Sequence, residues 1–337
     1  MPPSLRLICG IIQNDTGGMG KSLAEYADWL AERDLIWPAP PVPVPPKATP
    51  FLKPLPEVRG VVWNVYGTLL NIADGELLQL VDDPLRMEVA LDKTVQEFNM
   101  WNSMYRKPGA PWELMFQQYQ PLVTELRLTG KVRRGETAEI DSARVWRILV
   151  ERLLQKKYTW DEALYGDLEA YCQKIAWFFH RALQGCGPAE GAAEALLALA
   201  TRGVVQGLVG AGQCFTVAEL RRHLEEGAGL GRRPLPLAAG CLSLSSELGA
   251  APPTERLFTP VLETLGNLGI APGEVLYVSS RLVADLAPAK RLGLRTALFA
   301  GDKTSLRATG TQVRDPELQP DRILTALNQI HQIIPGR

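Results

Sequence analysis

Short apolar stretches and amphipathic stretches alternate along the second half of this chain. From residue 187 onward, short runs of mostly apolar residues are separated by segments whose apolar side chains recur at helical spacing. Parallel strands need a crossover between them, so this alternation predicts a parallel sheet with helices on both faces. The pattern predicts strands at 203–209, 238–244, 275–279 and 296–299, and helices at 189–200, 216–226, 255–268, 281–292 and 321–334.

One more strand precedes this region, within residues 59–65. Val61, Val62 and Trp63 are strand-forming residues, and Gly67 ends the stretch in a loop. The following hundred or so residues contain no clear strand. Their amphipathic spacing instead predicts helices at 85–104, 112–126, 142–157 and 161–183.

The chain therefore divides into four parts. A helical insertion (74–185) interrupts an α/β core (59–73 and 186–337), and an N-terminal segment (1–37) is joined to that core by a proline-rich linker (38–58). Nine prolines lie in the stretch 38–56, which predicts an extended polyproline II conformation. We interpret the linker as a stiff strap; the alternative is a docking site for a proline-binding module.

The N-terminal segment contains a strand-like stretch at 5–12 and a predicted helix at 22–34, with Thr16-Gly-Gly-Met-Gly-Lys-Ser22 between them. This loop resembles the phosphate loop of the deviant Walker ATPases, so nucleotide binding by Gly17–Ser22 is an alternative function. However, Asp15 and Thr16 depart from that pattern, and the proline-rich linker follows where a nucleotide-binding sheet would be needed. We expect a glycine-rich turn with Ser22 as the helix cap.

The same segment carries two tryptophans, Trp29 and Trp37. If residues 1–36 dock on the main domain instead of binding ATP, both indole rings will be partly buried. This burial is a direct structural test of the two interpretations.

Charge and cysteine content narrow the range of partners. The chain has 36 Lys+Arg against 37 Asp+Glu, which gives no electrostatic reason to expect nucleic acid or an anionic membrane. Its five cysteines are scattered and it has only three histidines, so a Cys/His zinc site is not expected. No apolar run approaches the ~18 residues of a membrane span. We expect a cytoplasmic protein with reduced thiols.

The strand at 59–65 leads into a recognisable motif. Asn64-Val-Tyr66-Gly-Thr68-Leu resembles the first motif of the haloacid dehalogenase superfamily, where a strand ends in Asp-x-Asp-Gly-Thr-Leu. Asn64 and Tyr66 stand at the two aspartate positions, whereas the Gly-Thr-Leu sequence matches, including Thr68.

Three later stretches resemble the other motifs of the superfamily. The second motif, a strand ending in Ser or Thr, aligns with 207–212 and has Gly210 at the hydroxyl position. The third aligns with 245–258 and has Pro252 where relatives have lysine. The fourth, Gly-Asp-x-x-x-x-Asp, has Ser280 at its first acid and retains its second, Asp285.

The resemblance implies a doubly wound parallel sheet of strand order 3-2-1-4-5 with an inserted, all-helical cap. It also implies chemistry that needs an aspartate nucleophile, an aspartate acid, a lysine and carboxylates for Mg²⁺. Because these groups are replaced, we expect no bound Mg²⁺ or other cofactor. We expect instead a vestigial pocket between cap and sheet, less polar than a working one, made of Asn64, Tyr66, Thr68, Gly210, Pro252, Ser280 and Asp285.

The functional hypothesis is a catalytically inactive relative of these hydrolases with a binding or scaffold role toward an unknown protein or small molecule. The alternative is a hydrolase, of phosphatase or haloacid dehalogenase type, that uses substituted residues. Two residues could supply such a substitution: Cys214, just past the second motif, and Asp74, which we expect in the hinge of the cap.

Overall fold

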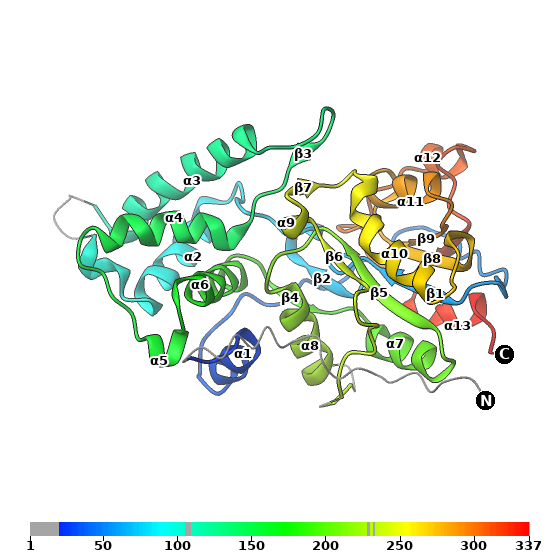
Figure 1. The fold of residues 1–337 in the computed structure, drawn as a ribbon, viewed down its shortest axis with the longest axis horizontal. Coiled ribbons are helices and arrows are strands. Elements are labelled where there is room, and N and C mark those ends of the chain that lie inside the picture. Colours follow the sequence, from blue (N-terminus) through cyan, green and yellow to red (C-terminus); the bar gives the residue numbers. More distant parts are fainter. Residues whose placement is uncertain (1–19, 105–108, 228–229, 232, 337) are drawn as a thin grey trace.

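A six-stranded parallel sheet forms the centre of the core (Figure 1). The structure is a computed structural model that describes residues 20–104, 109–227, 230–231 and 233–336. The strands lie in the order β10-β9-β8-β1-β5-β6, so the predicted 3-2-1-4-5 arrangement is confirmed, with β10 added at one edge. Their bounds are β1 (Gly60–Trp63), β5 (Val205–Gly210), β6 (Leu242–Leu244), β8 (Val275–Ser279), β9 (Arg295–Phe299) and β10 (Arg322–Leu324).

The central strand β1 shows why the sheet is buried on both faces. Val61 and Trp63 pack into one hydrophobic layer, whereas Val62 packs into the other, as the alternation of side chains along a strand requires. The first layer is closed by α7 (Ala192–Thr201), α8 (Thr216–Gly227) and α13 (Ile330–Ile333). The second is closed by α10 (Thr259–Asn267), α11 (Ala287–Arg291) and the turns η3 (Glu255–Phe258) and η5 (Leu282–Leu286).

The predicted helix at 321–334 is wrong. Residues 322–324 form β10, which pairs in parallel with β9, and only a 3-10 turn η6 (Leu327–Gln329) and the short α13 follow. The proline-rich linker adds an antiparallel bridge from Phe51 to Ile323. These pairings to distant parts of the chain override the local helical spacing.

The cap lies beside the sheet and consists mainly of helices, but the predicted all-helical cap also contains a two-residue strand, Thr137–Ala138, that pairs with the core (Figure 1). It leaves the core after β2 (Leu70–Ile72) and returns through β4 (Cys186–Pro188), and these two strands pair antiparallel. Its helices pack around an aromatic cluster that includes Tyr119, Trp146 and Phe179. The cap elements are η1 (Ala73–Gly75), α2 (Pro84–Glu97), η2 (Met100–Ser103), α3 (Pro111–Thr129), β3 (Thr137–Ala138), α4 (Ser142–Leu154), α5 (Glu162–Tyr165) and α6 (Leu168–Leu183).

Two predicted cap helices are shorter than expected, for local backbone reasons. The helix expected at 85–104 ends at Glu97, because Asn99 adopts a left-handed conformation with φ of 50°. The helix expected at 161–183 is divided at Gly166, whose φ is 80°.

The N-terminal segment docks on both cap and core. Helix α1 (Leu23–Ala31) begins with the predicted Ser22 cap, in a reciprocal capping box with Glu25. Tyr26 and Leu30 are fully buried against the cap cluster, while Trp29 and Trp37 are half-buried, as expected for docking. On the core side, Arg222 of α8 donates a hydrogen bond to the carbonyl oxygen of Ala27. The strand-like stretch predicted at 5–12 lies outside the described residues.

The linker continues as an extended strap across the joint between cap and core. A Cβ atom added to Gly185 would lie 1.9 Å from the carbonyl oxygen of Ala39, so only glycine fits beneath the strap. Farther along, the Val44 amide donates to Asp302 Oδ1 (2.9 Å). The strap interpretation of the linker agrees with these contacts.

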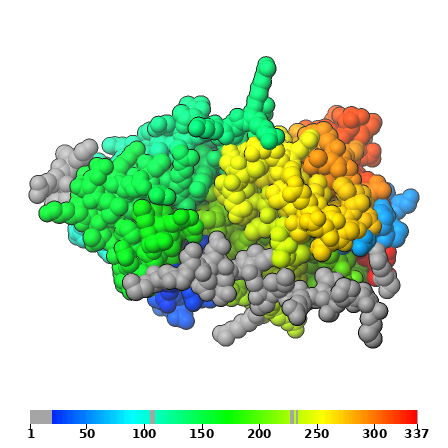
Figure 2. Space-filling view, viewed as in Figure 1, coloured from blue at the N-terminus to red at the C-terminus, as the bar shows by residue number. Residues whose placement is uncertain are grey.

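A second connection joins cap and core through a loop that projects from the surface between α3 and β3 (Figure 2). Strand β3 pairs antiparallel with β7 (Ala250–Ala251) of the core, just after α9 (Ser245–Leu248). Glu136 of this loop accepts hydrogen bonds from Arg256 (2.8 Å) and Thr254 (2.7 Å) of the core. The two connections approach the cap from different sides of the molecule (Figure 1).

The remaining short elements are η4 (Pro272–Glu274) and α12 (Gly310–Arg314). Within the described residues, no helix is long and apolar enough to cross a membrane.

Candidate functional site

The first motif lies at the carboxyl end of β1, the central strand. Asn64 follows that strand directly and is 1% exposed. Its Nδ2 donates to the carbonyl oxygen of Tyr66 (3.1 Å), and its Oδ1 has no hydrogen-bond partner. A Cβ atom on Gly210, at the end of the neighbouring β5, would lie 2.4 Å from that Oδ1. The amide therefore fills the space that a hydroxyl-bearing side chain at position 210 would need.

Tyr66, at the second aspartate position, turns its hydroxyl toward α8. It donates to Glu219 Oε2 (2.6 Å) and lies 3.2 Å from Thr216 Oγ1. Burial, followed by the charge of Glu219, raises the pKa of Tyr66 well above its usual value. Tyr66 is therefore a structural hydrogen-bond donor and is unsuited to protonate a leaving group at neutral pH.

The surviving acid, Asp285, is bound by an arginine of its own segment. Arg281 donates from Nε to Oδ2 (3.0 Å) and from Nη2 to Oδ1 (2.9 Å), the two-pronged pairing that suits a carboxylate. Ser279 adds a third hydrogen bond to Oδ2 (2.6 Å). Both side chains are buried, with 1% of Asp285 and 10% of Arg281 exposed.

Although burial alone would lower the pKa of Arg281, the adjacent Asp285 carboxylate raises it above its usual value. The guanidinium thus stays charged and supplies the positive charge that this carboxylate needs.

These contacts do not fit a magnesium ion. Mg²⁺ requires oxygen ligands, preferably carboxylates, in near-octahedral arrangement. Two of the expected acids are Asn64 and Ser280, and both oxygens of the third, Asp285, already accept hydrogen bonds from Arg281. A guanidinium has no acceptor atom and cannot share a site with a cation.

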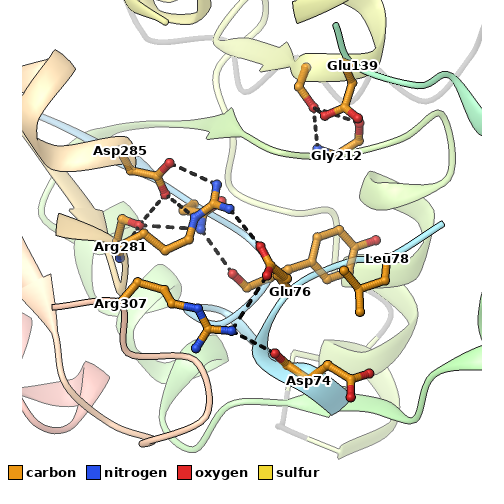
Figure 3. A network of polar contacts seen from close by, with 12 residues as sticks. Asp74, Glu76, Leu78, Glu139, Gly212, Arg281, Asp285 and Arg307 are labelled. Atoms are coloured by element: carbon orange, nitrogen blue, oxygen red, sulfur yellow. Dashed lines mark hydrogen bonds and ion pairs between the residues drawn. The ribbon is translucent and has the colours of Figure 1, made fainter. Parts of the chain in front are cut away.

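The charged network continues from Arg281 toward the cap hinge (Figure 3). Arg281 Nη1 lies 3.7 Å from Glu76 Oε2, and Arg307 Nη2 lies 3.7 Å from Glu76 Oε1. Arg307 also donates to the carbonyl oxygen of Asp74 (3.0 Å). This edge of the sheet is therefore charged, because Arg281, Arg307 and Glu76 lie near Asp285. That the pocket is less polar than a working one stays a prediction.

The other predicted site residues lie at or near this edge of the sheet. Ser280 and Thr68 are buried, and their hydroxyl oxygens have no hydrogen-bond partner. The Ser280 hydroxyl approaches Gly67 closely, since a Cβ added there would lie 3.0 Å from it. Pro252 follows β7 in the segment that leads to η3, and it carries no charge that could replace a lysine.

The strand order, the central position of the motif strand and the cap inserted behind it together identify the architecture. The chain has a haloacid dehalogenase-like fold.

No protein-family model and no curated protein matches the sequence. Among solved structures, it is similar to a HAD phosphatase from Thermococcus onnurineus (15% identity, TM-score 0.46, 83% of this chain and 99% of that chain). It is also similar to a dehalogenase with an intermediate complex (16% identity, TM-score 0.43, 84% of this chain and 99% of that chain). A third similar structure is the L-2-haloacid dehalogenase from Xanthobacter autotrophicus (19% identity, TM-score 0.39, 81% of this chain and 96% of that chain).

Neither of the two predicted substitute residues is arranged for catalysis in this haloacid dehalogenase-like fold. Burial raises the pKa of the Cys214 thiol, which keeps it protonated and unreactive. Asp74 is held by Arg86 through two hydrogen bonds (2.7 and 3.0 Å), with a third from Gln184. The Arg86 pairing lowers the pKa of Asp74 and fixes its side chain at the hinge.

The described part of the glycine-rich loop, Gly20–Ser22, is engaged in packing. The Lys21 amide donates to the carbonyl oxygen of Leu164 (3.0 Å), and the Ser22 amide donates to Glu25 (2.7 Å). Phosphate loops bind through free backbone amides, and these two amides have protein partners. Residues 17–19 of the proposed nucleotide loop lie outside the described residues.

Sequence reasoning missed three features of the site. Arg281 stands four residues before Asp285, and this i,i+4 spacing of opposite charges was an available signal for a pair. Glu139 is buried beside Gly212 and accepts a hydrogen bond from Ser245 (2.6 Å) (Figure 3). Glu219, the partner of Tyr66, lies on a helix far along the chain, and no local pattern marks it.

Proposed function

We propose that this chain is a catalytically inactive protein with a haloacid dehalogenase-like fold, and that it acts in binding or as a scaffold. The observation that carries the proposal is the bond between Arg281 and Asp285. A hydrolase of this kind needs a metal ion on its acidic residues. In this chain the positive charge comes instead from the Arg281 side chain, which is buried together with Asp285.

The residues at the two aspartate positions of the first motif, Asn64 and Tyr66, also support the proposal of an inactive protein. An uncharged amide at Asn64 is a very poor nucleophile, and it fills the space that a hydroxyl-bearing side chain at position 210 would need. Tyr66 keeps its proton because of burial and Glu219. Loss of one catalytic group of this kind can reduce a rate by roughly 10⁴-fold, and here several are absent together.

We further propose a cytoplasmic location and a protein or small-molecule partner. Balanced charge gives no electrostatic reason for nucleic acid or an anionic membrane, and scattered cysteines are usual for a reducing compartment.

The experiment is a hydrolysis assay of the full chain with an aryl phosphate and with 2-chloropropionate, each with Mg²⁺ and with chelator. We expect no turnover above buffer in any condition, and no difference between the chain and its Asn64→Ala variant. Turnover that disappears in Asn64→Ala or Asp285→Asn would contradict the proposal and support the hydrolase alternative. Melting curves of both variants would confirm that they are folded.

A further inference from the structure

Three side chains with metal-binding atoms meet on the face of the core that α8 covers, away from the Arg281–Asp285 pair. They are Cys186 of β4 and Glu219 and His223 of α8. One ligand atom from each lies within 4.8 Å of the other two. Glu219 and His223 are four residues apart, so the helix places both on one face, toward the strand that carries Cys186.

From this geometry we propose that Cys186, Glu219 and His223 form a binding site for a divalent transition metal ion of the zinc type. Ligand atoms around tetrahedral zinc lie roughly 3.3–3.8 Å apart, given bond lengths of about 2.0–2.3 Å. The observed spacing of up to 4.8 Å exceeds this by about 1.0–1.5 Å at most, which rotation of the Cys186 and His223 side chains toward the fixed Glu219 carboxylate can close.

The kinds of ligand atom select the metal. Thiolate and imidazole bind zinc-like ions strongly, whereas Mg²⁺ and Ca²⁺ prefer oxygen ligands throughout. On binding, the thiol of Cys186 loses its proton to solvent, and the thiolate with the Glu219 carboxylate neutralises the charge of the ion. Three protein ligands leave a fourth position for water or a ligand.

The surroundings of the cluster hold its carboxylate in place. Tyr66 donates to Glu219 Oε2 (2.6 Å), and the Tyr66 hydroxyl lies 3.2 Å from Thr216 Oγ1. Hydrogen bonds of this kind orient metal-binding carboxylates and typically change affinity by about 10–100-fold. The replacement of an aspartate by Tyr66 in the first motif would then contribute to this second site.

Two arginines, Arg181 and Arg222, also lie close enough to the cluster for their charge to lower the pKa of Glu219. Each has a contact with another part of the chain. Arg222 donates to the carbonyl oxygen of Ala27 in α1. The Arg181 guanidinium stacks 4.5 Å from the centre of the Trp37 ring. Burial raises the pKa of the Cys186 thiol and of the Glu219 carboxyl, and nearby arginine charge offsets this only in part. A metal ion at this site therefore has to displace the thiol proton.

The experiment is titration of the untagged full chain, under reducing conditions, with Co²⁺ and then with Zn²⁺. Thiolate bound to Co²⁺ gives a charge-transfer absorption, so the spectrum reports Cys186 directly and does not depend on any enzymatic activity. We expect one equivalent of Co²⁺ to produce this absorption and one equivalent of Zn²⁺ to remove it, with no effect of excess Mg²⁺.

Matched variants assign the site. Cys186→Ser and His223→Gln should abolish the absorption, and Tyr66→Phe should weaken Co²⁺ binding by about 10–100-fold. Cys241→Ser, a thiol elsewhere in the core, should leave it unchanged. Melting curves without metal verify that each variant is folded. Absence of the absorption in the parent chain, or its persistence in His223→Gln or folded Cys186→Ser, would overturn the proposal.

Discussion

The sheet edge around Asn64 and the joints between cap and core are stabilised in different ways. At the sheet edge, Arg281 supplies a positive charge from the chain itself and binds the buried Asp285 carboxylate. At the joints, parts of the chain that are distant in sequence fasten the cap to the core, through the strap at Gly185 on one side and Glu136 on the other. In both regions, the buried or close-packed groups named here find their partners within the chain.

The two regions differ in how many interactions stabilise each of them. The sheet edge depends on one buried ion pair, so a single substitution should disturb it strongly. The joints are stabilised by several kinds of contact together: backbone pairing, close packing and a polar network around Gln213. In that network, Gln213 Oε1 accepts a hydrogen bond from the Ser142 amide (2.9 Å). A single substitution there should have a smaller effect.

The largest effect is expected from Arg281→Ala. This substitution leaves the buried Asp285 carboxylate without its cation, which costs about 3–5 kcal/mol of unfolding free energy. Urea unfolding at neutral pH measures the loss. The control is Arg307→Ala, a more exposed residue whose ion pair with Glu76 should contribute less than about 1 kcal/mol. Equal losses of unfolding free energy in the two variants would mean that the buried Arg281–Asp285 pair stabilises the fold no more than an exposed ion pair does.

A smaller effect is expected at the strap. Gly185→Ala places a methyl group against the carbonyl oxygen of Ala39, which should displace the strap and destabilise the fold by about 1–3 kcal/mol. Limited proteolysis should then cut residues 38–50 faster. Gly273→Ala is the control, because a Cβ atom there meets no atom within 4 Å. Unchanged proteolysis would show that the strap does not fasten the joint.

The sheet and its order were predictable because each strand is a compact apolar run followed by a helix. Val275–Ser279 has the same bounds in prediction and structure. The motif residues Asn64, Gly210 and Ser280 were also placed correctly at one edge, since parallel strands bring their carboxyl ends together.

What could not be predicted depends on contacts between distant segments. Strand β10 forms only by pairing with β9 and Phe51, so its own sequence reads as helix. The cluster of Cys186 and His223 joins two elements with no characteristic spacing between them. The expectation that a Cys/His zinc site is absent rested on the scattered cysteines and on the presence of only three histidines.

A third effect concerns pH and the joint near Gln213. Burial lowers the pKa of His180 to about 3, and its Nε2 lies 2.8 Å from Ser142 Oγ. In the unfolded chain this histidine has an ordinary pKa near 6.5 and is protonated below that pH, whereas in the folded chain it stays neutral. The free energy of unfolding therefore falls as the pH drops below about 6.5. The loss should approach roughly 1.4 kcal/mol per pH unit.

His180→Gln keeps a hydrogen-bonding side chain but cannot titrate. Its unfolding free energy should therefore fall less steeply than that of the parent between pH 6.5 and 4.5, measured by urea unfolding at each pH. Identical slopes would mean that His180 does not titrate on unfolding as its burial requires.

The most direct test of the central claim is the melting temperature of the full chain with and without Mg²⁺. If Arg281 has replaced the metal ion at Asp285, then Mg²⁺ and chelator should leave the melting temperature unchanged. A bound ion at a hundredfold excess over its dissociation constant would stabilise the fold by about 2.7 kcal/mol, a shift that melting detects easily. A Mg²⁺-dependent rise in melting temperature that is lost in Asp285→Asn would contradict the account.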